Sequence, residues 1–153
     1  MGNRRRSREL AMQALFQMEM KQDDSAEALE LFCKHFGMSK TAKPFFLKLV
    51  NGVREFQHEI DPLIERFSEN WKISRMSRVD RNVIRIAVYE LLHCDDIPPK
   101  VSINEAIDIG KRFGTEDSGA FINGILDSVR VSLEKENRLS SKQSGEHAQT
   151  PST

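Results

Sequence analysis

The sequence predicts an all-α fold, a compact helical domain of about seven helices. Apolar residues recur at spacings of three and four along most of the chain, which is the pattern of helices with one buried face. No segment alternates apolar and polar residues strongly enough to predict a strand. The 153 residues have the size of one domain. We expect that domain at residues 1–135, followed by a disordered polar tail at residues 136–153.

The first two helices are predicted before residue 37. Residues 4–22 keep the helical spacing of apolar side chains throughout. Asp24 with Glu27 three residues later has the form of a capping box, so we expect Asp24 to cap the second helix. That helix should end at Gly37, because glycine readily adopts the left-handed conformation found at helix ends.

The third and fourth helices are predicted from Thr41 to about His58 and from Asp61 through Phe67. Thr41 is a suitable N-terminal cap, and Pro44 is tolerated in the first turn that follows it. Asp61 is followed directly by proline, a pair that is typical of a cap and a first helical position. We therefore expect a new helix to begin there.

The fifth helix, residues 79–93, is predicted to be the central element of the fold. Its apolar residues cover more than one face, so it should pack against several neighbours. Pro98 and Pro99 then force an extended connection. Ser102 and Glu105 form a second predicted capping box at the start of the sixth helix.

The sixth helix should end near Phe113, and the last helix is predicted after a turn at residues 115–118. Gly124 lies inside this last helix, where glycine costs up to about 1 kcal/mol relative to alanine. We expect close helix packing at Gly124 to offset that cost.

The distribution of charge, rather than its total, points to a nucleic-acid partner. The 23 basic and 23 acidic side chains cancel, so the net charge alone gives no support for one. Residues 4–8 carry Arg4, Arg5, Arg6 and Arg8 without an acid. Arginine binds phosphate through paired hydrogen bonds, and arginines at a helix start are unfavourable without a nearby anion. RNA phosphate is one interpretation of that anion, and a solvated, frayed terminus is the other interpretation of the cluster.

A second set of arginines recurs every three or four residues along one side of the central helix: Arg75, Arg78, Arg81 and Arg85. Arg85 lies between two isoleucines, and the nearby Glu90 could pair with an arginine at a helix packing seam, so we expect a structural role for Arg85. Arg81 follows an aspartate, and we expect it to be more exposed and to contact RNA.

Two aromatic residues, Phe113 and Phe121, flank a turn that contains Asp117. Unpaired bases stack on such rings, and a carboxylate accepts hydrogen bonds from base edges. The residues alone favour the alternative, in which both rings belong to the core and Asp117 only caps the last helix.

The motifs of common enzyme classes do not occur. The chain contains neither phosphate-cradling glycine loop nor a nucleophile elbow, so we expect no catalytic activity and no cofactor. The cluster at residues 93–96 resembles a metal ligand set, but adjacent residues on a helix point in different directions. We interpret it as a helix terminus entering an acidic loop.

The sequence favours a cytoplasmic protein. Only Cys33 and Cys94 are present, too few for the disulfide framework of a small secreted domain. No run of about 18 apolar residues occurs, so we expect no membrane span. The arginine-rich start is not followed by a long apolar stretch, so a secretion signal is not expected either.

Four segments resemble the NusB family and occur in that family's order. In chain order they are residues 4–9 (RRRSRE), 79–91 (VDRNVIRIAVYEL), 101–107 (VSINEAI) and 121–127 (FINGILD). Together they cover the chain from its start to about residue 130. Chance resemblance of four segments in one order is improbable, so the sequence is identified as a member of this family.

The resemblance implies an all-helical fold of two small bundles. It also implies a protein that pairs with the ribosomal protein NusE to bind the single-stranded boxA element of nascent ribosomal RNA. That assembly would act on RNA polymerase together with other Nus factors.

Carried over by position, the family's RNA surface comprises Arg4, Arg5, Arg6, Arg8, Asp80, Arg81, Phe113, Asp117 and Phe121. The resemblance therefore favours RNA contact at the aromatic turn. Family members often have tyrosine where Phe16 stands, so no hydroxyl contact is expected there.

Two alternatives stay open at this point. The first is the RNA-binding domain of a ribosomal RNA cytosine methyltransferase, whose N-terminal part resembles NusB. We expect chain length to exclude it, because about 20 residues after the helices cannot form a cofactor-binding domain. The second is a structural dimerisation module, since some NusB-like proteins associate as homodimers.

Overall fold

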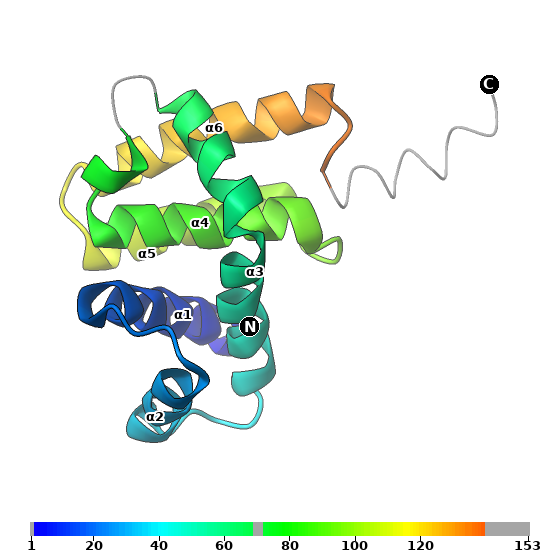
Figure 1. Ribbon diagram of the computed structural model, residues 1–153. Helices are drawn as coiled ribbons and strands as arrows, with labels where there is room; N and C mark the ends of the chain where they lie inside the picture. Colours follow the sequence, from blue (N-terminus) through cyan, green and yellow to red (C-terminus); the bar gives the residue numbers. More distant parts are fainter. Residues whose placement is uncertain (1, 69–71, 140–153) are drawn as a thin grey trace.

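A computed structural model describes residues 2–68 and 72–139. Within these ranges the chain forms six α-helices and one short 3-10 helix without any strand, which confirms the predicted all-α class (Figure 1). In chain order the elements are α1 (Gly2–Lys21), α2 (Ala26–Phe36), α3 (Lys43–Phe67), η1 (Ile73–Arg75), α4 (Arg78–His93), α5 (Pro99–Phe113) and α6 (Ser118–Lys135).

The helices form two groups that share α3. Figure 1 shows α1 and α2 beside the first part of α3, and α4 and α6 beside its later part, with α5 packed against α4 and α6, as two small bundles. α4 packs against α1, α3, α5 and α6. Residues 82–91 of α4 are all buried, because helices pack around this stretch and its few polar side chains, such as Arg85 and Glu90, are paired inside the molecule. The prediction that this helix is central is confirmed.

α3 consists of two helical parts joined by a kink, which agrees with the two helices predicted for this stretch. The kink lies at Phe56, where φ is −104° and ψ is 15°, a few residues before the predicted break at Asp61. The second part runs through Pro62 to Phe67, so the helix does not begin anew at Asp61. The Phe56 ring holds the bend against α4, with its centroid 4.0 Å from the ring of His93.

The caps of α2 show how neighbouring residues compete. Ser25 rather than Asp24 caps the helix, because its hydroxyl accepts a hydrogen bond from the Ala28 N–H. Asp23 in turn accepts from the Ser25 N–H. Gly37 ends the helix with φ of 53°, as predicted.

Two other predicted caps are wrong for similar reasons. Ala42 directly precedes α3, and its backbone N–H donates to the hydroxyl of Ser39 rather than to that of Thr41. α5 begins at Pro99, so Ser102 lies within its first turn. The Ser102 hydroxyl donates to a buried carboxylate of α4 instead of capping a helix.

Close helix packing occurs at Gly52 and not at Gly124. A Cβ at Gly52 would lie 2.2 Å from Cζ of Tyr89, so this glycine allows α3 to approach α4. A Cβ at Gly124 would meet nothing within 4 Å, and the residue is exposed. The packing expected at Gly124 is therefore wrong.

The last described residues continue the core. α6 ends at Lys135, and Leu139 is 1% exposed within the apolar core. Residues 140–153 of the predicted tail lie outside the described residues.

Candidate nucleic-acid interface

The arginines at the start of α1 face carboxylates of the chain itself. Arg4 donates to Asp96 at 2.8 Å, beyond the end of α4. Arg5 donates to two carboxylates of α5, to Glu105 at 2.8 Å through Nε and to Asp108 at 2.9 Å. The anions next to this cluster in the folded chain are therefore protein side chains, which compensate the charge at the helix start.

These ion pairs shift the pKa of their members. The hydrogen bond from Arg4 lowers the pKa of Asp96 below its ordinary value. The hydrogen bond from Arg5 likewise lowers the pKa of Glu105, and it raises the pKa of the Arg5 guanidinium. Both carboxylates therefore stay ionised at neutral pH.

Arg8 differs from the other arginines at the start of α1 because its side chain lies inside the molecule. Its side chain is 5% exposed and that of Glu90 is 1% exposed. The guanidinium donates to both Glu90 oxygens, at 2.8 and 2.9 Å, and Ser102 adds a third hydrogen bond to the same carboxylate at 2.7 Å. Burial alone would lower the pKa of Arg8, but the pairing with Glu90 raises it overall. Arg8 therefore joins α1 to α4 inside the molecule.

A line of charged side chains continues from the arginine cluster along α1 and α5. We call it the charged seam, and its members are Arg6, Glu9 and Arg112. Glu9 is buried and accepts from Arg112 at 2.7 Å, while Arg6 lies 3.6 Å away from it. Arg112 is exposed and lies over the ring of Phe113, with its Cζ 5.2 Å from the ring centroid. Sequence reasoning missed Arg112. A basic residue directly before an aromatic residue is the signal that could have found it.

The seam ends at an apolar hollow that contains Phe113. This hollow has a volume of about 470 Å³ and joins Phe16 of α1, Val79 of α4 and Phe113 of α5. All three side chains are half-buried against the core. One side of Phe113 therefore packs against the core, and the other side lines the hollow.

The beginnings of α4 and α6 form a second pocket that brings Asp80, Asp117 and Phe121 together. It has a volume of about 250 Å³, and Arg75 and Met76 complete its lining with a serine. One carboxylate oxygen of Asp80 is buried without a hydrogen-bond partner. Asp117 is exposed and precedes α6 without capping it through its side chain. Two acceptors and one aromatic ring therefore face a single small space.

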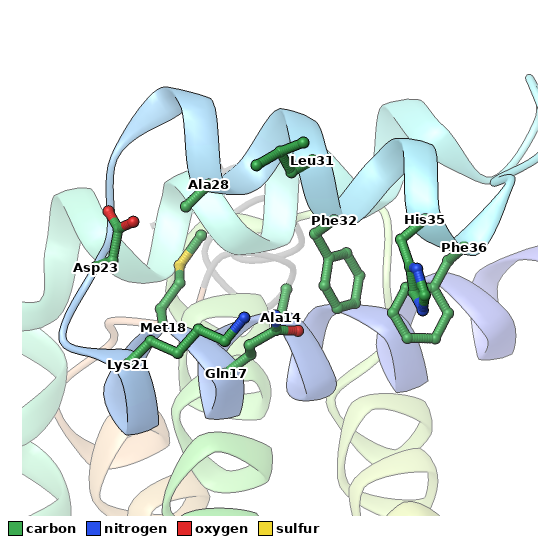
Figure 2. Close-up of a pocket in the computed structure, with 10 residues that line it drawn as sticks. All are labelled: Ala14, Gln17, Met18, Lys21, Asp23, Ala28, Leu31, Phe32, His35 and Phe36. Atoms are coloured by element: carbon green, nitrogen blue, oxygen red, sulfur yellow. The ribbon is translucent and has the colours of Figure 1, made fainter.

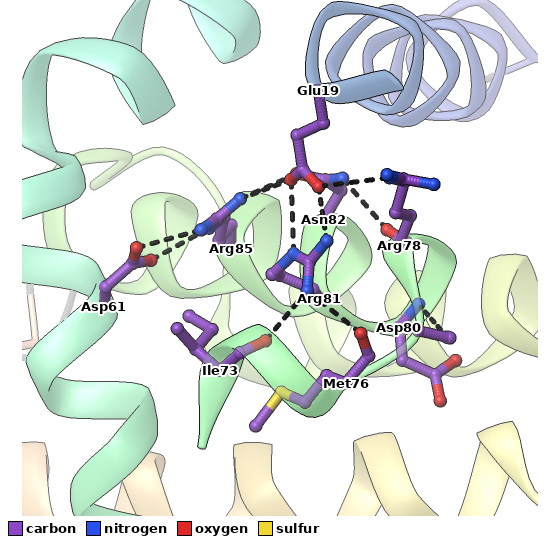
Figure 3. Close-up of polar contacts among 10 residues, drawn as sticks. Glu19, Asp61, Ile73, Met76, Arg78, Asp80, Arg81, Asn82 and Arg85 are labelled. Atoms are coloured by element: carbon purple, nitrogen blue, oxygen red, sulfur yellow. Dashed lines mark hydrogen bonds and ion pairs between the residues drawn. The ribbon is translucent and has the colours of Figure 1, made fainter. Parts of the chain in front are cut away.

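Arg81 belongs to an internal network rather than to an exposed stripe (Figure 3). It is paired with Glu19 and donates to the carbonyls of Ile73 at 2.8 Å and Met76 at 2.9 Å. Its side chain is 11% exposed and that of Arg85 is 9% exposed. The expected contrast in exposure between the two arginines is therefore wrong.

Arg85 has the structural role predicted for it. It donates to both oxygens of Asp61, at 2.8 and 2.9 Å, and to Glu19 at 2.7 Å. Glu90, which the sequence predicted to pair with an arginine at a helix packing seam, binds Arg8. The two carboxylates come from α1 and α3, far from Arg85 in sequence, so spacing along α4 could not reveal them.

Glu19 holds the wall of the second pocket in place. Burial alone would raise its pKa, but hydrogen bonds and charge from Arg81 and Arg85 lower the pKa below the ordinary value of 4.5. Through Arg81, this carboxylate fixes the carbonyls of Ile73, the first residue of η1, and of Met76, the residue after it. The position of the pocket therefore depends on α1 as well as on α4.

A separate groove of about 500 Å³ lies between α1 and α2 and contains no predicted site residue. Figure 2 shows the side chains of both helices that line it, among them Gln17 and Lys21 of α1 and Phe32 and Phe36 of α2. We do not include it in the interface.

Residues 2–68 and 72–139 contain no group of three or more His, Cys, Asp or Glu side chains placed to hold a metal ion. Asp96, from the acidic loop considered as a ligand set, is bound to Arg4 instead. None of the helices described is long and apolar enough to cross a membrane.

Known proteins resemble the chain over most of its length. The transcription antitermination protein NusB of Desulfatibacillum aliphaticivorans is 57% identical over 142 residues, which are 93% of this chain and 99% of that protein. The protein of the same name from Myxococcus xanthus is 52% identical over 139 residues, 88% of this chain and 99% of its own.

Solved structures share the fold as well. T. maritima NusB superposes with a TM-score of 0.80 at 44% identity and covers 92% of this chain and 96% of its own. A chain from a crystal structure of antitermination factors NusB and NusE with double-stranded RNA superposes with a TM-score of 0.78 at 26% identity, covering 86% and 98%. A family model described as the NusB family matches residues 5–130. The chain therefore belongs to the NusB family.

Proposed function

We propose that this protein is a transcription antitermination factor that binds boxA-type single-stranded RNA in nascent ribosomal RNA transcripts. It does so together with the ribosomal protein NusE and acts in the cytoplasm on RNA polymerase with other Nus factors. In this proposal the protein is a binding module without catalytic activity or cofactor.

The observation that carries the proposal is the continuity of the charged and aromatic groups along α1 and α5. Arg6 and Arg112 lie on either side of Glu9, and Arg112 lies over Phe113. Phe113 shares its hollow with Phe16. The 12 helical steps from Arg4 to Phe16 span about 18 Å at the rise of 1.5 Å per residue. A single strand of RNA can follow such a seam from a basic end to an aromatic end.

The site residues divide into two roles in this proposal. Arg4, Arg5 and Arg6 are exposed enough to contact phosphates, which gives affinity without sequence preference. Phe121 offers its ring to a base, while Asp80 and Asp117 accept hydrogen bonds from a base edge that carries N–H groups.

Two residues of the predicted RNA surface serve it indirectly. Arg8 is held by Glu90 and fixes the start of α1 on α4. Arg81 is held by Glu19 and fixes the wall of the pocket that contains Asp80. Neither guanidinium needs to meet RNA for the surface to work.

The comparisons support this function over the alternatives. The curated relatives named above carry the name transcription antitermination protein, which favours it over a methyltransferase domain. The similar chain in complex with NusE and double-stranded RNA supports both a NusE partner and an RNA ligand.

The test is a salt series of RNA binding for charge-reversed and stacking variants in the presence of the NusE-type partner. Arg5→Glu with Arg6→Glu should weaken boxA-like and scrambled RNA alike and reduce the salt slope by about 0.7 for each lost phosphate contact. Phe121→Ala should lose about 1–3 kcal/mol of stacking and mainly reduce discrimination between the RNAs.

Arg66→Glu is the matched control for charge reversal. Arg66 is exposed and pairs with Glu136 just beyond α6, at the end opposite Phe121. Its reversal should leave RNA affinity within about twofold. If the Arg5 and Arg6 reversals weaken RNA no more than the Arg66 reversal does, the arginines are not the phosphate surface.

A further inference from the structure

We infer that Asp96 and Asp108 compete with RNA phosphate for the arginines at the start of α1 and so set the RNA affinity of the protein. The inference rests on the proposed function, because it requires Arg4 and Arg5 to bind RNA. It concerns two exposed acidic residues that lie outside the predicted RNA surface.

Both arginines are engaged by exposed carboxylates of the chain itself. Asp96 accepts from Arg4 at 2.8 Å, and Asp108 accepts from Arg5 at 2.9 Å. The side chains of Asp96 and Asp108 are 52% and 51% exposed. Each carboxylate therefore occupies, at the protein surface, guanidinium N–H groups that a phosphate would use.

The carboxylates around this cluster fall into two classes. Glu9 and Glu90 are buried, and Glu105 is 18% exposed, so these three are fixed parts of the packing. Arg5 binds one carboxylate of each class. Glu105 holds it through Nε and Nη2, while Asp108 binds Nη2 only. Loss of Asp108 therefore leaves Arg5 anchored.

RNA binding exchanges one anion for another at each exposed pair. Surface ion pairs contribute little because water and salt screen them, so a phosphate can displace an exposed carboxylate readily. The displaced aspartate nevertheless stays a few ångströms from the phosphate and repels it. Coulomb's law in water at about 6 Å gives roughly a threefold loss of affinity for each such charge. The pKa of Asp96 is lowered by its hydrogen bond with Arg4, so its charge persists at neutral pH.

The experiment compares RNA affinity for the full chain and the variants Asp96→Asn, Asp108→Asn and the double variant. The probe is a boxA-like RNA with the NusE-type partner at about 0.1 M salt. We expect about threefold tighter binding for each single variant and about tenfold for the double. The gain should shrink as salt rises, because the repulsion is screened.

Asp127→Asn is the matched control. Asp127 is 60% exposed and pairs with Arg130 at 2.8 Å on α6, so its loss removes the same charge elsewhere. It should change RNA affinity less than 1.5-fold by the same screening argument. If the double variant binds no more tightly than the Asp127 variant, the inference is overturned.

A double-mutant cycle with Arg5→Gln separates this inference from the proposed function. If Arg5→Gln weakens RNA and abolishes the gain from Asp108→Asn, both stand. If Arg5→Gln weakens RNA but Asp108→Asn gives no gain, the competition is wrong and the proposed function survives. If Arg5→Gln leaves RNA affinity unchanged, the arginine surface itself is wrong and the inference falls with it.

Discussion

The buried pair of Arg8 and Glu90 gives the most demanding prediction about this fold. Arg8→Met should destabilise the protein by about 3–5 kcal/mol, because it leaves the Glu90 carboxylate charged and buried without its partner. That carboxylate is 1% exposed and would keep only the hydrogen bond from Ser102, at 2.7 Å, among those the structure gives it. A loss of this size is about a fifth or more of the roughly 5–15 kcal/mol that stabilises a typical domain.

The double variant Arg8→Met with Glu90→Met should recover most of that loss. Replacing both members of a buried ion pair by apolar residues of similar volume is often neutral or stabilising. Urea unfolding followed by circular dichroism at 222 nm gives the free energies of unfolding for the cycle. The midpoint temperature of Arg8→Met should also fall by about 10–20 °C.

Arg6→Met is the matched control, because Arg6 lies on the same helix but is exposed and only 3.6 Å from its partner. It should cost less than about 1 kcal/mol. The double variant of Arg8→Met with Glu90→Met should bind RNA within about twofold of the parent, since Arg8 is internal. A loss below 1 kcal/mol for Arg8→Met, or a double variant no more stable than Arg8→Met, would refute the reasoning about this pair.

Three further variants are checked by urea unfolding. Glu19→Gln should cost about 2 kcal/mol at pH 7, because it weakens charged hydrogen bonds from two arginines. Since the folded pKa of Glu19 lies below 4.5, this contribution is complete above pH 4.5 and fades as the pH falls below it. Gly52→Ala should cost about 1–3 kcal/mol, because its Cβ would overlap the ring of Tyr89. Gly124→Ala should stabilise the protein by up to about 1 kcal/mol, because its Cβ meets nothing.

Different results would contradict each step. A stability difference between Glu19→Gln and the parent that stays constant from pH 7 to pH 3 would show that the carboxylate charge is not what stabilises the network. Equal stabilities of the Gly52 and Gly124 variants would show that the approach of α3 to α4 is not limited by Tyr89.

The fold class follows from the sequence because burial imposes its period directly on apolar residues. Residues 79–93 carried apolar side chains on more than one face, and the structure places this segment at the centre. Helix ends were less predictable, since several short polar residues compete for each cap. Asp23, Asp24 and Ser25 are all suitable by type, and only the folded backbone decides that Ser25 accepts the N–H.

The arginine pairings could not be predicted because the partners lie far apart along the chain. Arg8 and Glu90 are separated by 82 residues, and Arg81 and Glu19 by 62. The sequence therefore identified cationic side chains without indicating which ones the core would take up. The pocket of Asp80, Asp117 and Phe121 was reached by resemblance, and its geometry depends on two helix starts meeting.

The role of a helical glycine is also hard to predict from the sequence. Propensity correctly marks a helical glycine as costly but cannot say whether packing requires it. Gly52 is required by the ring of Tyr89, whereas nothing in the described structure explains Gly124.

The proposed function requires that this protein recognise a specific single-stranded RNA together with its NusE-type partner. The most direct measurement is the ratio of dissociation constants for a scrambled RNA and a boxA-like RNA, both measured with that partner at physiological salt. We expect a ratio well above 10 for the parent that falls by about tenfold or more in Phe121→Ala, because the base that Phe121 holds would no longer be presented to Asp80 and Asp117. Equal dissociation constants for the two RNAs in the presence of the partner would contradict it.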